Sequence, residues 1–115
     1  MKQVLVVDDE AAIRFAFEQF LRDEGYEALL AENSDEALKL LQDTIPDLVF
    51  LDYRLPGMDG IHVLEKIRRQ QPGLPVIFMT AFGAMEVAIK AMQLGAYEYL
   101  TEPLDLDQVR LLIKR

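Results

Sequence analysis

The sequence contains no cysteine, and this absence excludes a disulfide framework, a thiolate metal site and catalysis by a thiol. Long apolar runs are also missing, since no segment approaches the roughly 18 apolar residues of a membrane-spanning helix. The apolar stretch before Asp8 is too short for a secretory signal. No repeat, linker or low-complexity tract interrupts the chain. We therefore expect a protein with no membrane segment, which is consistent with a cytoplasmic location.

Basic residues are comparatively few. Among 115 residues, 12 are Lys or Arg and 20 are Asp or Glu, which leaves a formal net charge of −8. An acidic surface repels nucleic acid, so we expect no direct contact of this chain with DNA or RNA. Basic protein surfaces and multivalent cations are the favoured partners. Hydrophobic residues make up 51% of the chain and are spread evenly, as in one globular domain.

Short continuous apolar segments alternate along the chain with segments of helical periodicity. The predicted strands lie at 4–7, 26–31, 47–52, 75–79 and 97–100. The predicted helices lie at 11–24, from Asn33 or Ser34 through Leu41, from Ile61 to a stop at 71–73, at 85–94, and from Asp105 or Leu106 to the last residue. Gly25 and Gly95 stand where C-terminal helix caps belong.

Strands that are apolar throughout are typical of a parallel sheet buried on both faces. Five such strands that alternate with five helices across short loops predict an α/β fold with helices on both sides of the sheet. The last helix is still in phase at Arg115. We therefore expect residues 1–115 to be one domain, cut from a longer protein.

Polar side chains stand at the ends of several predicted strands. Asp8 and Asp9 follow the first strand, Asp52 closes the third, Thr80 closes the fourth and Glu102 follows the fifth. In open α/β sheets, ligands bind beyond the carboxyl ends of the strands, where the strand order reverses. If the first and third strands are neighbours at that point, Asp8 or Asp9 converges with Asp52.

Converging carboxylates repel one another by a few kcal/mol at an effective dielectric near ~20. Such a group either shares a proton or holds a divalent cation. Oxygen ligands of this kind suit Mg²⁺ or Mn²⁺. A carboxylate beside the metal, such as Asp52, is also a competent nucleophile for a phosphoryl group, and Thr80 could donate to a phosphoryl oxygen. The residues indicate metal-assisted phosphoryl transfer onto an aspartate.

Four segments, in this order and spacing, resemble the receiver domains of bacterial response regulators over essentially the whole chain. They read VLVVDDE at 4–10, DLVFLDYRLPGMDG at 47–60, MTAFG at 79–83 and GAYEYLTEP at 95–103. The resemblance implies the flavodoxin-like fold of receivers, a five-stranded parallel sheet in the order 2-1-3-4-5 with five helices on both faces. It also implies that the domain receives a phosphoryl group from a sensor histidine kinase.

The resemblance assigns roles to individual residues. Asp52 would be the phosphoacceptor. Asp8 and Asp9 would be the acidic pair that holds Mg²⁺, or Mn²⁺, together with Asp52 and the backbone carbonyl of Arg54. These assignments describe a phosphorylated signalling module, not an enzyme acting on a separate substrate.

The same resemblance implies a conformational switch. Thr80 would be the switch hydroxyl, and Tyr99 would be the aromatic side chain that turns inward on phosphorylation. The peptide bond before Pro103 is commonly cis in this family. Phosphorylation would then change the surface formed by the fourth helix, the fifth strand and the fifth helix, and through it an output domain or a partner.

The run from Thr80 to Ala96 is similar to the receivers of nitrogen-regulator-type sigma-54 activators. Those proteins normally carry an ATPase domain and a DNA-binding domain downstream, so the resemblance implies a role in transcription regulation. A homodimer is one arrangement compatible with it.

Glu102 departs from the family pattern, in which a lysine precedes the proline and its ammonium group binds the phosphoryl group. Two unit charges about 4 Å apart interact at around 4 kcal/mol at an effective dielectric of ~20. Glutamate therefore replaces an attraction with a repulsion of similar size. We expect higher affinity for Mg²⁺ and weaker capture of the phosphoryl group.

Two other function classes remain open beside the phosphorylated receiver. Glu102 supports a pseudo-receiver, an interaction domain of the same fold that no longer transfers phosphate. A haloacid-dehalogenase-type phosphatase is disfavoured because its Asp-x-Asp pattern is replaced by Asp52-Tyr53-Arg54 and no room exists for a cap domain. A flavodoxin-like electron carrier is also disfavoured, since acids occupy the loop at 8–10 where a flavin phosphate would need backbone donors.

Overall fold

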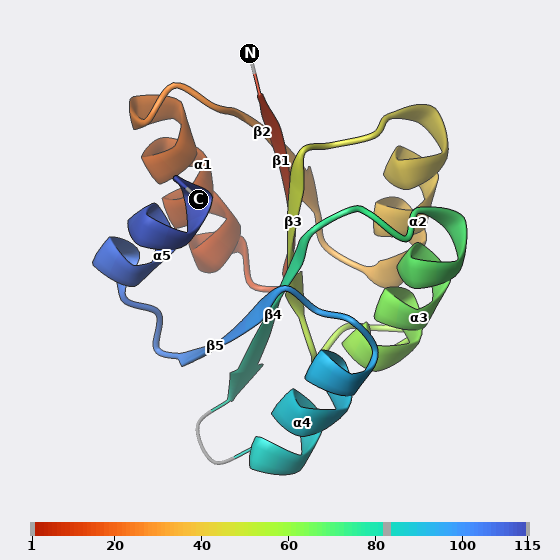
Figure 1. Cartoon of the computed structure of the whole chain (residues 1–115). Coiled ribbons are helices and arrows are strands. Elements are labelled where there is room, and N and C mark those ends of the chain that lie inside the picture. The colour runs from red at the N-terminus through yellow and green to blue at the C-terminus, as the bar shows by residue number, and fades with distance from the viewer. Residues whose placement is uncertain (1, 82–83, 115) are drawn as a thin grey trace.

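The computed structural model describes residues 2–81 and 84–114. Strands and helices alternate along this part of the chain (Figure 1). The strands are β1 (Gln3–Val7), β2 (Glu27–Ala31), β3 (Leu48–Asp52), β4 (Val76–Ala81) and β5 (Glu98–Glu102). The helices are α1 (Ala11–Asp23), α2 (Ser34–Asp43), α3 (Gly60–Gln70), α4 (Met85–Gln93) and α5 (Leu106–Ile113). The element order expected from the sequence is confirmed.

The five strands form one parallel sheet in the order β2-β1-β3-β4-β5. Every residue of β3 is buried, which explains why its sequence is apolar without alternation. The flavodoxin-like fold and its strand order are therefore as predicted. Because β1 and β3 are direct neighbours while β2 lies on the other side of β1, the strand order reverses at β1 and β3.

The helices cover both faces of the sheet (Figure 1). On one face, α2, α3 and α4 pack over a core that includes Leu51, Leu64 and Phe78. On the other face, α1 and α5 pack over a core that includes Phe17 and Phe50, whose ring centroids lie 4.9 Å apart. Each strand contributes alternate residues to the two cores because successive side chains point to opposite faces.

The bounds differ from the sequence prediction mainly at the carboxyl ends of β4 and β5. The ladder between them continues through Thr80 with Thr101 and Ala81 with Glu102, so both strands extend two residues beyond the predicted ends. The sequence did not predict this extension because the polar residues Thr80, Thr101 and Glu102 follow the apolar runs of the two strands. The fifth helix ends at Ile113, and Arg115 lies outside the described residues, as do Phe82 and Gly83 of the fourth matching segment.

Local signals in the sequence account for several helix ends. The side chain of Asn33 accepts a hydrogen bond from the backbone of Glu36 and caps α2. Gly25 and Gly95 follow α1 and α4 with φ of 87° and 94°, a conformation that glycine adopts without steric cost. None of the helices in the described part of the chain combines the length and the apolar character needed to cross a membrane.

Candidate functional site at the carboxyl edge of the sheet

The carboxyl ends of the three central strands and β5 bring the predicted site residues to one edge of the sheet. Val7 pairs with Leu51, so Asp8 and Asp52 are the next residues on adjacent strands β1 and β3. Glu102 closes β5, two strands from β3, and pairs with Ala81. The sequence therefore placed these acids at the correct edge, and the register decides which of them meet.

Asp8, Asp52 and Glu102 form a carboxylate cluster in which one oxygen from each residue lies within 4.8 Å of the others. Asp8 and Asp52 are 2% and 8% exposed, and Glu102 is half-buried. No Lys or Arg of the described residues forms an ion pair with any of these three carboxylates. Within the part of the chain that the structure describes, the excess of negative charge at this edge is therefore not neutralised by a direct ion pair.

The electrostatics of the carboxylate cluster follow from this arrangement. Burial raises the pKa of Asp52 to about 8, and the neighbouring charges of Asp8 and Glu102 add to the effect. Burial likewise raises the pKa of Asp8 to about 6, although the backbone N–H of Glu10 donates to its Oδ1 at 2.9 Å and opposes the change. The pKa of Glu102 is raised by burial, and a hydrogen bond with Asp52 opposes that rise.

Asp9 and Arg54 lie beside the cluster. Both line a hollow of about 330 Å³ that Asp52, Glu102 and Ala81 also line. Asp9 is exposed and does not belong to the group of carboxylates within 4.8 Å. The two acids after β1 are thus not equivalent, because Asp8 is buried and Asp9 faces the solvent-accessible hollow.

Thr80 is 1% exposed, and its hydroxyl has no hydrogen-bond partner among the described residues. The sequence placed Thr80 at the end of its strand, but it lies one residue inside β4. Alternation along β4 puts its side chain on the face of Phe78, whose neighbour in register on β5 is Tyr99. Asp52 shares the opposite face with Phe50. A buried hydroxyl without a protein partner is uncommon, so Thr80 is available to donate a hydrogen bond to a ligand.

Tyr99 is half-buried and packs against the core beneath α4. The peptide bond between Glu102 and Pro103 is cis, as the resemblance implied. His62, at the start of α3, is exposed and its Nδ1 lies 2.8 Å from Asp59 Oδ1. This contact belongs to the helix cap, because Asp59 also accepts from the backbone of His62.

Two residues that support the site were not identified from the sequence. Ser34 is buried, and its Oγ accepts from Met58 N at 3.1 Å and bonds the carbonyl of Pro56 at 3.3 Å, which ties the loop after β3 to α2. Gly60 donates its N–H to the carbonyl of Tyr53 at 2.8 Å and packs directly on the Asp52 backbone. The sequence predicted a loop from the turn-rich segment at 56–60. The roles of Ser34 and Gly60 depend on contacts with other parts of the chain, which the sequence pattern does not show.

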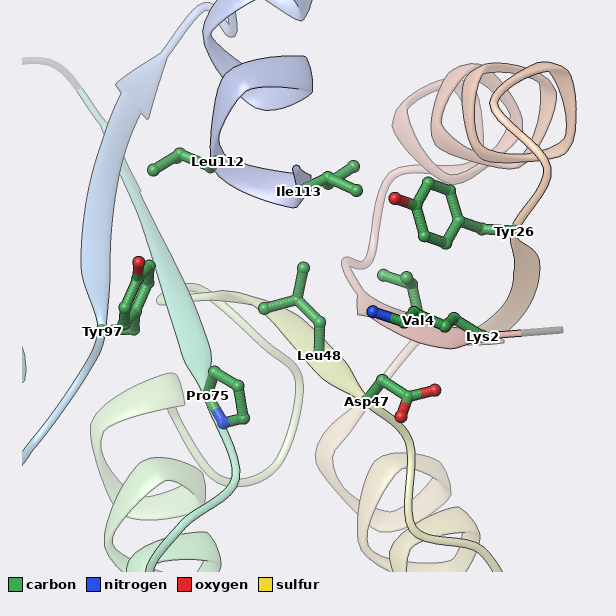
Figure 2. A pocket seen from close by; sticks show the side chains of 9 residues that line it. All are labelled: Lys2, Val4, Tyr26, Asp47, Leu48, Pro75, Tyr97, Leu112 and Ile113. Atoms are coloured by element: carbon green, nitrogen blue, oxygen red, sulfur yellow. The ribbon is translucent and has the colours of Figure 1, made fainter. Parts of the chain in front are cut away.

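A second hollow, of about 220 Å³, lies at the amino edge of the sheet (Figure 2). Its lining is largely apolar and includes Leu48, Pro75 and Leu112, with Lys2 and Asp47 also present. Asp47 there accepts a hydrogen bond from the backbone of Gln3 at 2.8 Å. The acids of the carboxylate cluster stand at the other end of these strands, so the chemistry indicated by the sequence does not belong to this hollow.

Among the described residues, the carboxylate cluster at the carboxyl edge offers oxygen donors to a ligand. Carboxylates, a backbone carbonyl and a hydroxyl match the preferences of hard divalent cations such as Mg²⁺ and Mn²⁺. Two buried carboxylates with raised pKa values are also the kind of group that a cation stabilises in the ionised form. The donor set fits a divalent cation, and Asp52 is placed as a nucleophile beside it.

Comparison with known proteins agrees with this arrangement. The chain is 41% identical over 112 residues to the DNA-binding transcriptional regulator NtrC of Salmonella typhimurium, covering 97% of this chain and 24% of that protein. It is 35% identical over 114 residues to sporulation initiation phosphotransferase F of Bacillus subtilis, covering 99% of this chain and 92% of that protein. The chain thus spans about a quarter of the length of its NtrC relatives.

Solved structures give the same result. The crystal structure of the receiver domain of NtrX from Brucella abortus is 40% identical, covers 97% of this chain and 95% of that one, and superposes with a TM-score of 0.92. The family model for the response regulator receiver domain matches residues 4–114 of this chain. With this match and the carboxylates at the strand ends, the chain belongs to the response regulator receiver domain family.

Proposed function

We propose that this domain accepts a phosphoryl group on Asp52 and relays the change to a partner surface. The observation that supports the proposal most directly is the position of Asp52, buried at the end of β3 beside Asp8 and open to a hollow of about 330 Å³. Receiver domains of response regulators are signalling modules, and this chain belongs to that family. The phosphoryl donor would be a sensor histidine kinase.

In the proposed reaction, an ionised oxygen of Asp52 attacks phosphorus and forms an acyl phosphate. The bond between phosphorus and the donor atom breaks at the same time, and the donor keeps the electron pair. That atom is a histidine nitrogen of the kinase, which then takes up a proton from solvent, or the acetate oxygen of acetyl phosphate. No oxidant or reductant is needed.

Mg²⁺ or Mn²⁺ would be held by Asp8, Asp9, Asp52 and the backbone carbonyl of Arg54. When bound, the cation neutralises carboxylate charge and orients phosphoryl oxygens. Asp8 and Asp9 enter the site from the turn between β1 and α1, and Arg54 enters from the loop after β3. Ser34 and Gly60 hold that loop in place.

Signalling would use the buried hydroxyl of Thr80. A phosphoryl oxygen on Asp52 offers this hydroxyl an acceptor, and its movement frees space beside Phe78 and Tyr99 on the α4 side of the sheet. The surface made by α4, β5 and α5 would then change and act on an output domain or on a second copy. The relative NtrC is a DNA-binding transcriptional regulator, so the output would regulate transcription. The resemblance to sigma-54 activators implies that an ATPase domain and a DNA-binding domain would carry it out.

A mass measurement tests the phosphoacceptor. The chain is incubated with acetyl phosphate and Mg²⁺, and the intact mass is compared with that of Asp52→Asn treated in the same way. We expect the mass of one phosphoryl group on the wild-type chain only, because the amide of Asn is a poor nucleophile. Equal labelling of the two proteins would contradict the assignment, and absence of labelling in both would remove this function.

A second candidate function is a pseudo-receiver that binds partners without taking up phosphate. The observation that favours it is Glu102, whose carboxylate lies within 4.8 Å of Asp52 and repels an incoming phosphoryl group. We expect Glu102→Lys to accelerate phosphorylation of Asp52 by at least roughly tenfold, since it restores a cation next to the developing charge. Equal rates and yields in the two proteins, measured by intact mass over time, would count against the pseudo-receiver.

A further inference from the structure

The carboxylate of Glu102 is part of the group that meets at the carboxyl edge, not a bystander on the loop before Pro103. One of its oxygens lies within 4.8 Å of oxygens from Asp8 and Asp52, whereas Asp9 does not join this group. Its placement is fixed by the backbone, because Glu102 is the last residue of β5 and pairs in register with Ala81 of β4. Glu102 is half-buried and belongs to the carboxylate cluster at this edge.

We propose that Glu102 is itself a ligand of the divalent cation, so that Asp8, Asp52 and Glu102 form a three-carboxylate site. This inference rests on the proposed function and deepens it, since it identifies which residue takes over the space of the family's lysine. A lysine there contributes a positive charge that compensates Asp52. Glutamate cannot do so, and it contributes an oxygen donor to the cation instead.

The charges at this edge favour a cation as a partner. Three carboxylates meet without a Lys or Arg ion pair among the described residues, and two of them are buried. Ionised carboxylates in a partly buried site are costly unless a cation or a proton compensates them. A divalent cation would reduce the charge of three ionised carboxylates from −3 to −1. Asp52 and Glu102 also line the hollow of about 330 Å³ that Asp9 lines, so a cation could reach them from solvent.

The proposal makes two properties change in opposite directions when position 102 is altered. A ligand contributes to affinity for the cation, so removing its carboxylate weakens binding. The same removal relieves repulsion of the phosphoryl group, so phosphorylation becomes faster. If Glu102 acted only through its charge at a distance, its effect on the cation would be small and would disappear at high salt.

Titration of the full 115-residue chain with Mn²⁺, followed by the electron paramagnetic resonance signal of the free ion, measures this affinity directly. We expect Glu102→Gln to raise the Kd for Mn²⁺ at least about tenfold, a loss typical of removing one metal-site interaction. Glu10→Gln is the matched control, because Glu10 carries the same charge and lines the same hollow but is not in the three-residue group. We expect less than about a threefold change in that control, and the difference persists in ~1 M KCl.

Glu102→Asp keeps a carboxylate on a shorter side chain and is expected to retain more affinity than Glu102→Gln. Thermal unfolding in the presence of a chelator verifies that each variant is folded. The inference is overturned if Glu102→Gln and Glu10→Gln bind Mn²⁺ equally well, or if the loss vanishes in high salt. The mass measurement on the wild-type protein tests phosphorylation of Asp52 independently of this titration. If Glu102 proves not to be a ligand, phosphorylation of Asp52 can still be observed, and if Asp52 is not phosphorylated, the Mn²⁺ affinities can still be compared.

Discussion

Gly60 limits how the residues around Asp52 can change. A Cβ on Gly60 would collide with the carbonyl oxygen of Asp52 and would lie 2.8 Å from the Cα of Tyr53. Both contacts are with backbone that cannot rotate away. Gly60 is therefore required by the close approach of α3 to the end of β3, and the phosphoacceptor depends on that approach.

We expect Gly60→Ala to lower the free energy of unfolding by about 1–3 kcal/mol, the usual cost of overpacking a rigid site. Urea denaturation monitored by circular dichroism measures this change. Gly73→Ala is the control, because a Cβ there meets no atom within 4 Å and its φ is not in the left-handed region. A Gly60→Ala midpoint equal to that of Gly73→Ala would show that the backbone at Asp52 moves without cost.

At the scale of elements, the sequence predicts the strands and their order of appearance well, because short continuous apolar runs such as Leu48 to Leu51 are typical of buried parallel strands. It also locates the acids at the carboxyl edge, since they follow those runs directly. The flavodoxin-like strand order required the resemblance to receiver domains. Periodicity alone does not order parallel strands.

Contacts that depend on register were less predictable. The sequence predicted Thr80 at the end of its strand, whereas β4 continues to Ala81 and alternation places Thr80 on the face of Phe78 and Tyr99. The sequence also left open whether Asp8 or Asp9 meets Asp52, and the structure shows that Asp8 is buried in the cluster with Asp52. Pairing between β4 and β5 brings Glu102 into the cluster, and no pattern within either strand encodes that pairing.

At the scale of the whole molecule, the carboxylate cluster couples stability to pH. The pKa of Asp52 is raised from 3.8 to about 8 and that of Asp8 from 3.8 to about 6, mainly by burial. The folded protein therefore binds more protons than the unfolded chain between these values, and the free energy of unfolding falls as pH rises through this range. The lowered pKa values of Glu24 and Asp59 act in the opposite sense, and only in more acidic solution.

We accordingly expect the protein in a chelating buffer to lose at least about 1 kcal/mol of stability between roughly pH 5 and pH 8. Urea denaturation at several pH values measures the loss. Asp52→Asn, which cannot ionise, should flatten the dependence, and millimolar Mg²⁺ should restore stability most strongly at the alkaline end because the cation binds ionised carboxylates. The opposite result would be a stability of the wild-type protein, in chelating buffer, that stays constant or rises across this range. It would mean that Asp8 and Asp52 are ionised without a compensating partner, and the electrostatic account of the carboxyl edge would be wrong.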